Sequence, residues 1–226
     1  MSVPSPSALS RHVAELYPAG AGVPPVLRLM QIYRPYLCPF DLLLPLVQPG
    51  GTMLDVGCGG GLWLGLCAKF GLIRSGLGFD SSPMAIAAAR AMQANIRPAG
   101  DAPAPVLEFQ HRAVAEGWPQ GTFDTVTIID VMHHVPVSQQ RDVITQAASH
   151  LKPGGILIYK DIDEGHRIKA TMNRLHDLIM ARQWIHYARA EDVITWGEAA
   201  GLEKLAFMDM HRLWYPHELI VFGKKR

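Results

Sequence analysis

An acidic residue followed by three alternate glycines forms the segment of this chain with the clearest chemical meaning. The residues of this turn are Asp55, Gly57, Cys58, Gly59 and Gly61. Glycine adopts positive φ without a steric penalty and lets the backbone approach a ligand closely. The apolar run from Leu62 has helical spacing, and the free N–H groups at a helix start can bind a carboxylate-bearing ligand. The segment therefore predicts a strand, a tight turn and a helix that hold a cofactor.

The spacing of these glycines separates two kinds of cofactor. Nicotinamide and flavin dinucleotides are typical of a G-x-G-x-x-G pattern, which needs a glycine where Leu62 stands. The sequence therefore disfavours a dinucleotide, although an NAD-dependent oxidoreductase of related fold stays an alternative. A glycine-rich loop without function is disfavoured by the strand and helix signals on either side.

A second acid, Asp80, ends the short apolar stretch that begins at Gly76, and Ser81 follows it. An ionised carboxylate can accept hydrogen bonds from two neighbouring hydroxyls, as the ribose of a nucleoside presents them. Asp80 also stands about 25 residues after Asp55, a spacing that resembles the acid spacing of nucleotide-binding βαβ units. The structural alternative is that Asp80 only caps the next helix, a role that Ser81 or Ser82 could fill instead.

These segments resemble the class I S-adenosylmethionine-dependent methyltransferases, whose first motif is an apolar strand followed by Asp-x-Gly-x-Gly-x-Gly. Two later segments add to the likeness: a strand that ends at Asp130 before paired histidines, and a Pro-Gly-Gly turn at 153–155. The resemblance implies that S-adenosyl-L-methionine binds at the glycine turn. It further implies that Asp80 binds the ribose, with Ser81 and Asp130 at the same cofactor.

The sequence departs from this family where the adenine is expected. After the strand predicted over 106–110 the family usually places an acidic residue, whereas this chain continues with His111, Arg112 and Ala113. The resemblance still puts Arg112 and Ala113 at the cofactor. The contact to the adenine amino group is left to the backbone or to Gln110.

The candidates for acid–base chemistry are four histidines and Asp161, at the expected carboxyl ends of the strands and in the insertion. Methyl transfer is an in-line displacement, and a base is needed only if the acceptor has to lose a proton. His133 and His134 directly follow the strand that ends at Asp130, so they are the first candidates for a catalytic base. His176 and His186 come second, and for each histidine a structural role in its turn stays open. Adjacent histidine side chains diverge, so no metal site is expected.

The order of predicted elements indicates a Rossmann-like α/β fold. Strands and helices alternate from 50 to 161, which predicts a seven-stranded, mostly parallel sheet with helices on both faces and a closing antiparallel hairpin. The chain is expected to be a single methyltransferase domain. Its parts are an N-terminal helical cap over 1–47, interrupted by Pro35, Pro39 and Pro45, a cofactor-binding core over 50–161, a helical insertion over 163–187, and a C-terminal part of the sheet over 188–226. The cap could cover the active site or simply pack on the sheet.

The charge and composition of the chain exclude some classes of partner. The 226 residues carry a formal net charge of +1, which offers no basic excess for a nucleic acid. Apolar runs stay shorter than the roughly 18 residues of a membrane span, and no signal peptide is evident at Met1, so we expect a cytoplasmic protein. The three cysteines form no C-x-x-C pair, which argues against a disulfide framework. A homodimer is compatible with this composition.

Aromatic residues concentrate outside the predicted cofactor core, which favours an aromatic or apolar small molecule as methyl acceptor. The segment 175–187 also bears a faint resemblance to methyltransferases of bacterial aryl-polyene pathways, which implies O-methylation. Two alternatives remain: a protein that binds S-adenosyl-L-methionine without catalysis, and the NAD-dependent oxidoreductase.

Overall fold

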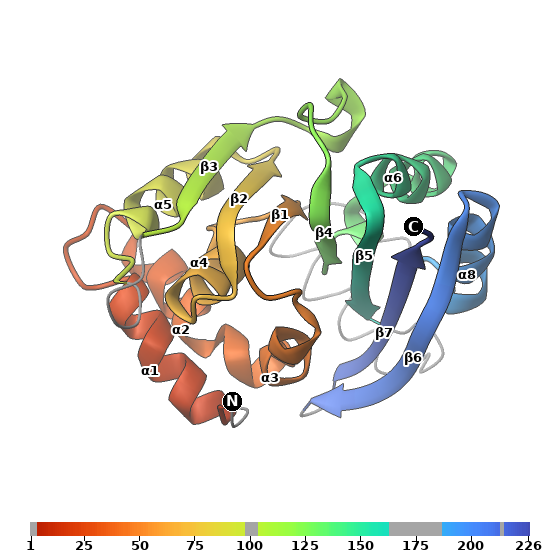
Figure 1. The fold of residues 1–226 in the computed structure, drawn as a ribbon. Coiled ribbons are helices and arrows are strands. Elements are labelled where there is room, and N and C mark those ends of the chain that lie inside the picture. The colour runs from red at the N-terminus through yellow and green to blue at the C-terminus, as the bar shows by residue number, and fades with distance from the viewer. Residues whose placement is uncertain (1–3, 98–103, 163–186, 213–214) are drawn as a thin grey trace. The chain divides into compact units, whose positions relative to one another are not determined.

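The computed structural model describes residues 4–97, 104–162, 187–212 and 215–226 (Figure 1). The chain divides into two compact units. The N-terminal unit comprises residues 1–119 with 123–125, and the C-terminal unit comprises 120–122 with 126–226. The predicted insertion over 163–187, with His176 and His186, lies outside the described residues except for Tyr187.

The N-terminal unit contains the predicted cap and the first half of the sheet. Its elements are α1 (Pro6–Leu16), α2 (Pro25–Leu37), α3 (Phe40–Leu43), the 3-10 helix η1 (Leu44–Leu46), β1 (Gly51–Val56), α4 (Leu62–Lys69), β2 (Ile73–Asp80), α5 (Pro83–Gln93), β3 (Val106–His111) and the 3-10 helix η2 (Val114–Glu116). Strand β2 pairs in parallel with both β1 and β3. In Figure 1, α4 lies against β2 and α5 against β3, so helices cover these strands.

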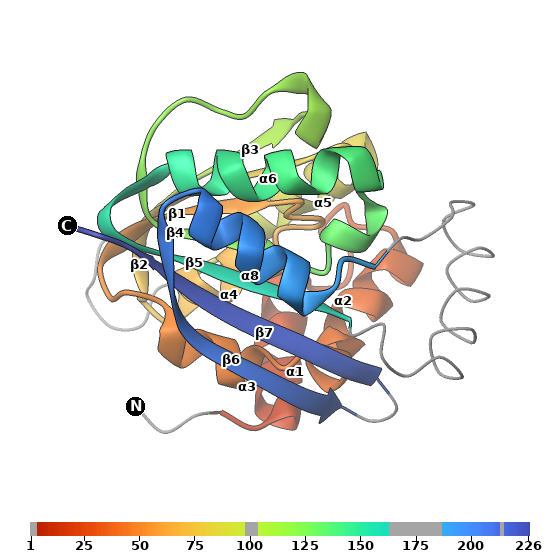
Figure 2. The same ribbon diagram turned by 90° about the vertical axis from the view of Figure 1, so that its right-hand side faces the viewer.

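The C-terminal unit begins within β4 (Phe123–Ile129). Its further elements are the 3-10 helix η3 (Met132–His134), α6 (Val137–Ser149), β5 (Leu151–Ile162), α8 (Ala190–Ala199), β6 (Leu202–Arg212) and β7 (Tyr215–Lys224). Strand β7 runs antiparallel to both β5 and β6. Figure 2 shows α6 and α8 side by side along these strands.

The strands follow the order β3-β2-β1-β4-β5-β7-β6, a seven-stranded sheet. Parallel strands in the first half and an antiparallel hairpin at the end confirm the predicted fold class. Burial explains the apolar sequence of the inner strands: Met53, Leu54 and Val56 of β1 are fully buried, as are Leu157 and Ile158 of β5.

Helix α2 ends at Leu37, as the sequence predicts for a helix that begins at Val26. The predicted interruption at Pro35 is wrong, because the helix continues through this residue. A proline inside a helix removes one hydrogen bond to the residue four positions earlier. Here it stands in the last turn, where only that bond is lost, and its ring is buried. Ser5 caps helix α1, because its hydroxyl accepts from Ala8 N at 3.3 Å.

Helices long and apolar enough to cross a membrane are absent from the described part of the chain. The three cysteines, Cys38, Cys58 and Cys67, are buried free thiols.

Candidate active site

The glycine turn between β1 and α4 has the backbone geometry that its sequence predicts. The φ angles of Gly57, Gly59 and Gly61 are 64°, 53° and 81°, values that residues other than glycine rarely adopt. A Cβ on Gly61 would lie 2.9 Å from both Ala89 Cβ and Met92 Cε, so this glycine lets α5 pack closely. Apart from Gly59 and its two chain neighbours, no atom of the described residues comes within 4 Å of a Cβ placed on Gly59. The turn is therefore packed on one side and open on the other.

Asp80 connects this turn to the start of α5. One carboxylate oxygen accepts from Gly59 N at 2.9 Å and the other from Ser82 N at 2.8 Å. Ser82 itself caps α5, since its hydroxyl accepts from Ala85 N at 3.2 Å. Asp80 is thus not the capping residue of that helix. An ionised carboxylate has about four lone-pair positions, so two accepted bonds leave room for ligand hydroxyls.

Asp55 and Cys58 contribute buried groups below the turn. Asp55 is 3% exposed. Burial, and next the charges of Asp55 and Asp80, raise the pKa of the Cys58 thiol, so this side chain stays neutral. Its Cβ and Sγ fill the space beside Gly78, where an added Cβ would come within 2.8 Å of both. The Cys58 N–H donates to Phe79 O at 3.0 Å, which fixes the turn against β2.

The remaining predicted cofactor residues of this unit gather after β2 and β3. Arg112 N donates to Asp80 O at 2.9 Å, and Ala113 N donates to the Glu116 carboxylate at 2.8 Å. Ser81 O is hydrogen-bonded to a His111 ring nitrogen at 3.0 Å. The structure therefore brings Ser81, Arg112 and Ala113 to the same edge of the sheet as Asp80. Their contacts to a cofactor stay predictions.

A buried pair formed by His133 and Asp161 is the most prominent polar feature of the C-terminal unit. His133 Nδ1 lies 2.5 Å from one Asp161 oxygen, and His133 N donates to the other at 3.2 Å. Ile162 N donates to the first oxygen as well, at 2.7 Å. The side chains of His133 and Asp161 are only 6% and 3% exposed. Three donors hold the Asp161 carboxylate, so the imidazole has a fixed orientation.

Asp130 has a partner of its own in Lys160. Its carboxylate forms an ion pair with the Lys160 ammonium, whose side chain is fully buried. Asp130 N also donates to Lys160 O at 2.8 Å. With φ of 56°, Asp130 is the single residue other than glycine at positive φ in the described ranges. The pair holds the sharp turn that leads from β4 to His133.

Further polar residues lie near the His133–Asp161 pair. Tyr159 is buried, and its hydroxyl has no hydrogen-bond partner among the residues that the structure describes. Burial raises the pKa of this phenol, and the charges of Asp161, Glu218 and Asp130 raise it further. Glu218 is 2% exposed and lies opposite Asp161 in the β5–β7 register. The Tyr187 ring lies 5.8 Å from the His133 ring. Acidic and phenolic groups thus surround the histidine.

The sequence located His133 but not its partner. The adjacent acid in the sequence is Asp130, yet Lys160 binds that carboxylate and Asp161 orients the histidine. Neighbouring His134 is exposed, with its ring 4.1 Å from the His133 ring. Sequence reasoning also missed Lys160 as an ion-pair partner. A Lys-Asp pair at the end of an otherwise apolar strand was the available signal.

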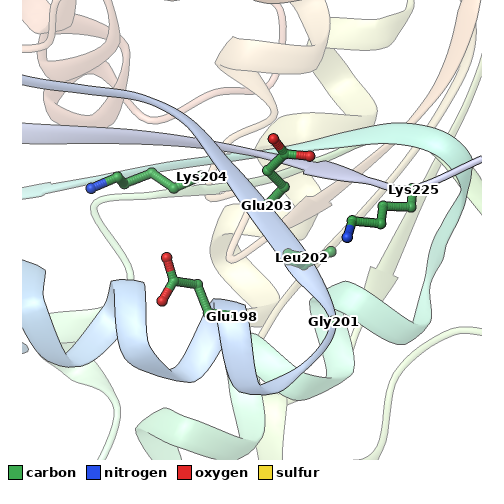
Figure 3. Close-up of a pocket in the computed structure, with 6 residues that line it drawn as sticks. All are labelled: Glu198, Gly201, Leu202, Glu203, Lys204 and Lys225. Carbon is green, nitrogen blue, oxygen red and sulfur yellow. The ribbon is translucent and has the colours of Figure 1, made fainter.

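A shallow hollow on the C-terminal unit, shown in Figure 3, lies elsewhere. It is lined by Glu198, Gly201, Leu202, Glu203, Lys204 and Lys225, from the turn between α8 and β6 and from the C-terminus. Both charge signs occur there, and no predicted site residue lines it. Within the described ranges no three His, Cys, Asp or Glu side chains form a group that could hold a metal ion.

The fold and the glycine turn define a Rossmann-like methyltransferase. A family model described as a methyltransferase domain matches residues 30–206, and the chain belongs to this family. The ubiquinone biosynthesis O-methyltransferase of Cronobacter sakazakii is 26% identical over 170 residues, which cover 72% of this chain and 65% of that protein. The chain thus spans just under two thirds of the length of this curated relative.

Solved structures agree on the fold. The magnesium protoporphyrin IX methyltransferase of Synechocystis PCC 6803, solved with bound SAH, superposes with a TM-score of 0.66 at 18% identity, covering 95% of this chain and 93% of that one. The N-methyltransferase NodS of Bradyrhizobium japonicum WM9 in complex with SAH gives 0.60 at 19% identity, with 99% and 100% covered.

Proposed function

We propose that this protein transfers a methyl group from S-adenosyl-L-methionine to an oxygen atom of an aromatic or apolar small molecule. The observation that carries the proposal is the buried His133–Asp161 pair, an oriented base at the end of β4 and β5. Membership of the methyltransferase domain family supports methyl transfer, and the name of the Cronobacter relative supports oxygen as the acceptor atom. A homodimer and a cytoplasmic location stay predictions from the sequence.

The N-terminal unit would hold the cofactor. The first turn of α4 offers N–H groups for the carboxylate of the methionine part, and Gly59 leaves the space above the turn open. Asp80 has lone pairs left for the ribose hydroxyls, and its bond to Gly59 N links the ribose-binding group to the turn. When bound, S-adenosyl-L-methionine supplies an electrophilic methyl group on a sulfonium centre.

The C-terminal unit would handle the proton. Because Asp161 accepts from Nδ1, the neutral imidazole of His133 presents its other nitrogen, Nε2, as the proton acceptor. His133 Nε2 would take the proton of the acceptor hydroxyl as the hydroxyl oxygen receives the methyl group, and S-adenosylhomocysteine would be the leaving product. The Asp161 carboxylate stabilises the imidazolium so formed.

The Lys160–Asp130 pair would serve this chemistry indirectly. A lone ammonium or carboxylate at this depth would be unfavourable, but each neutralises the other. The pair fixes the backbone at positive φ that places His133, and it leaves Asp161 as the acid that acts on the imidazole.

Incubation with methyl-labelled S-adenosylmethionine and a panel of phenols, alcohols, amines and carboxylic acids tests the proposal. The expected product is a labelled methyl ether, and His133→Ala should lower its rate about 10²–10⁴-fold. Binding of S-adenosylhomocysteine without transfer to any acceptor would instead favour a non-catalytic cofactor-binding protein. A thermal shift with NAD but none with S-adenosylhomocysteine would exclude the proposed cofactor.

A further inference from the structure

A tyrosine at the end of α1 reaches the glycine turn. The Tyr17 hydroxyl donates to Gly60 O at 2.7 Å, across 43 positions of sequence, and Tyr17 has no exposed surface. Burial raises the pKa of this phenol, and the nearby Cys58 adds to the increase, so the hydroxyl stays a protonated donor. The cap is thereby bonded to the turn that would hold the methionine part of the cofactor.

The backbone around Tyr17 is fixed from several directions. Arg28 Nε, from α2, donates to Tyr17 O at 2.7 Å. Asn95 Nδ2, which follows α5, donates to Leu16 O at 3.2 Å. Tyr17 N closes α1 with a 2.9 Å bond to Val13 O. Tyr17 is therefore a rigid strut between the cap and the turn.

The bond from Tyr17 fixes one peptide plane of the turn at both ends. Gly60 O accepts from Tyr17, and the N–H of the same peptide, that of Gly61, donates to Cys58 O at 2.9 Å. Gly59 N is bound to Asp80. The N–H of Gly60 makes no hydrogen bond to any described residue, which leaves it as a donor for a ligand. The Gln31 amide closes over Gly60, 3.1 Å from where a Cβ would stand.

We infer that Tyr17 is a positioning residue of the cofactor site, which orients the Gly60 peptide so that the turn can bind the amino-acid end of S-adenosyl-L-methionine. The inference rests on the proposed function. Without the hydroxyl, Gly60 O is a buried acceptor with no partner, and the turn has to move to satisfy it. That movement affects the amino-acid end of the ligand, while Asp80 still binds the ribose.

Two ligands allow the binding of the amino-acid end and of the ribose end of the cofactor to be measured separately. S-adenosylhomocysteine carries the amino-acid part and 5′-methylthioadenosine lacks it, whereas both carry the ribose and the adenine. Tyr17→Phe should raise the dissociation constant for S-adenosylhomocysteine about tenfold by calorimetry, the effect of one lost buried hydrogen bond. Binding of 5′-methylthioadenosine should change less than about twofold. In turnover, KM for S-adenosylmethionine should rise while kcat at saturation is retained.

Two further variants make the outcome decisive. Tyr33→Phe removes a hydroxyl from an exposed tyrosine of α2 and should leave the binding of both ligands unchanged. Asp80→Asn should weaken both ligands, which tests the cofactor site itself. If Tyr17→Phe weakens both ligands equally or neither, while Asp80→Asn weakens both, the role of Tyr17 is refuted and the proposed function stands. If Asp80→Asn weakens neither, the proposed cofactor site fails and the inference fails with it.

A merely structural role for Tyr17 has its own signature. It would lower the melting temperature of the free protein without changing the ratio of the two dissociation constants, and this result overturns the inference. Should Tyr17→Phe not fold, Arg28→Ala releases the Tyr17 carbonyl and leaves the hydroxyl in place. It should produce the same selective loss of S-adenosylhomocysteine, to a smaller extent, and equal loss of both ligands would again contradict the inference.

Discussion

The two units of this protein prepare their chemistry in different ways. In the proposed function the N-terminal unit binds the cofactor mainly through its backbone: glycines at positive φ and the N–H groups of a short turn, with a single carboxylate. In the C-terminal unit the proposed chemistry depends on side chains, as four ionisable groups from β5 and the turn after β4 form two pairs. Because of this difference, we expect substitutions in the N-terminal unit to weaken cofactor binding and substitutions in the C-terminal unit to lower turnover.

The largest effect expected from this comparison is on turnover alone. His133→Ala should lower kcat about 10²–10⁴-fold, because the base that takes the acceptor proton is lost. Calorimetry should find the affinity for S-adenosylhomocysteine unchanged, since the glycine turn and Asp80 are untouched. His211→Ala, an exposed histidine of β6, serves as the control. A loss of cofactor affinity in His133→Ala would remove the distinction between the units.

The Lys160–Asp130 ion pair should contribute to the free energy of unfolding. Lys160→Met leaves the largely buried Asp130 carboxylate without the Lys160 ammonium, and removing one partner of a buried pair typically costs about 3–5 kcal/mol. Urea unfolding measures this loss in the free energy of unfolding. Lys204→Met, at an exposed lysine of β6, should change it by less than about 0.5 kcal/mol. Equal effects would mean that the buried pair contributes nothing.

Two glycines of the same turn form a matched test of its packed and open sides. Gly61→Ala should lower the free energy of unfolding by about 2–4 kcal/mol, because backbone strain adds to the clash with Ala89 and Met92. Gly59→Ala adds only the strain, about 1–2 kcal/mol, but its methyl group enters the space proposed for the cofactor. Denaturation and calorimetry together should therefore rank the two variants in opposite order, and the same order in both measurements would refute the open side.

A further expected effect concerns the binding of the ribose. Asp80→Ala should weaken S-adenosylhomocysteine binding by about 1.5–3 kcal/mol, the usual range for hydrogen bonds to a charged group. It also removes the acceptor of Gly59 N, so a stability measurement accompanies the calorimetry. Unchanged affinity in a folded variant would refute the ribose assignment.

The sequence predicted the local structure of the glycine turn well, because that structure depends on neighbouring residues. The glycines, Asp80 and Ser82 act through backbone positions within a few residues of each other or on adjacent strands, and the strand-turn-helix pattern identifies them. Tyr17 was beyond such reasoning, because no pattern links a tyrosine of the cap to a carbonyl in the turn. The bond depends on how α1 packs.

The C-terminal site was predicted only in part for a related reason. His133 could be found from its place after a strand, but its partner depends on which side chains of β4 and β5 share a face. The sheet places Lys160 against Asp130 and Asp161 against the histidine, and no short-range sequence pattern predicts either pairing. Pro35 was misjudged because a proline in the last helical turn removes only one bond.

The central claim is that the glycine turn and Asp80 bind the methyl donor and that His133 takes the proton of an oxygen acceptor. Its most direct test is to react the protein with methyl-labelled S-adenosylmethionine and matched phenol and aniline acceptors, and to locate the label by mass spectrometry. The account predicts that the phenol gives a labelled methyl ether and that His133→Ala loses this product. The aniline should stay unlabelled with both proteins. Label on nitrogen, or an ether formed equally fast by His133→Ala, would contradict it.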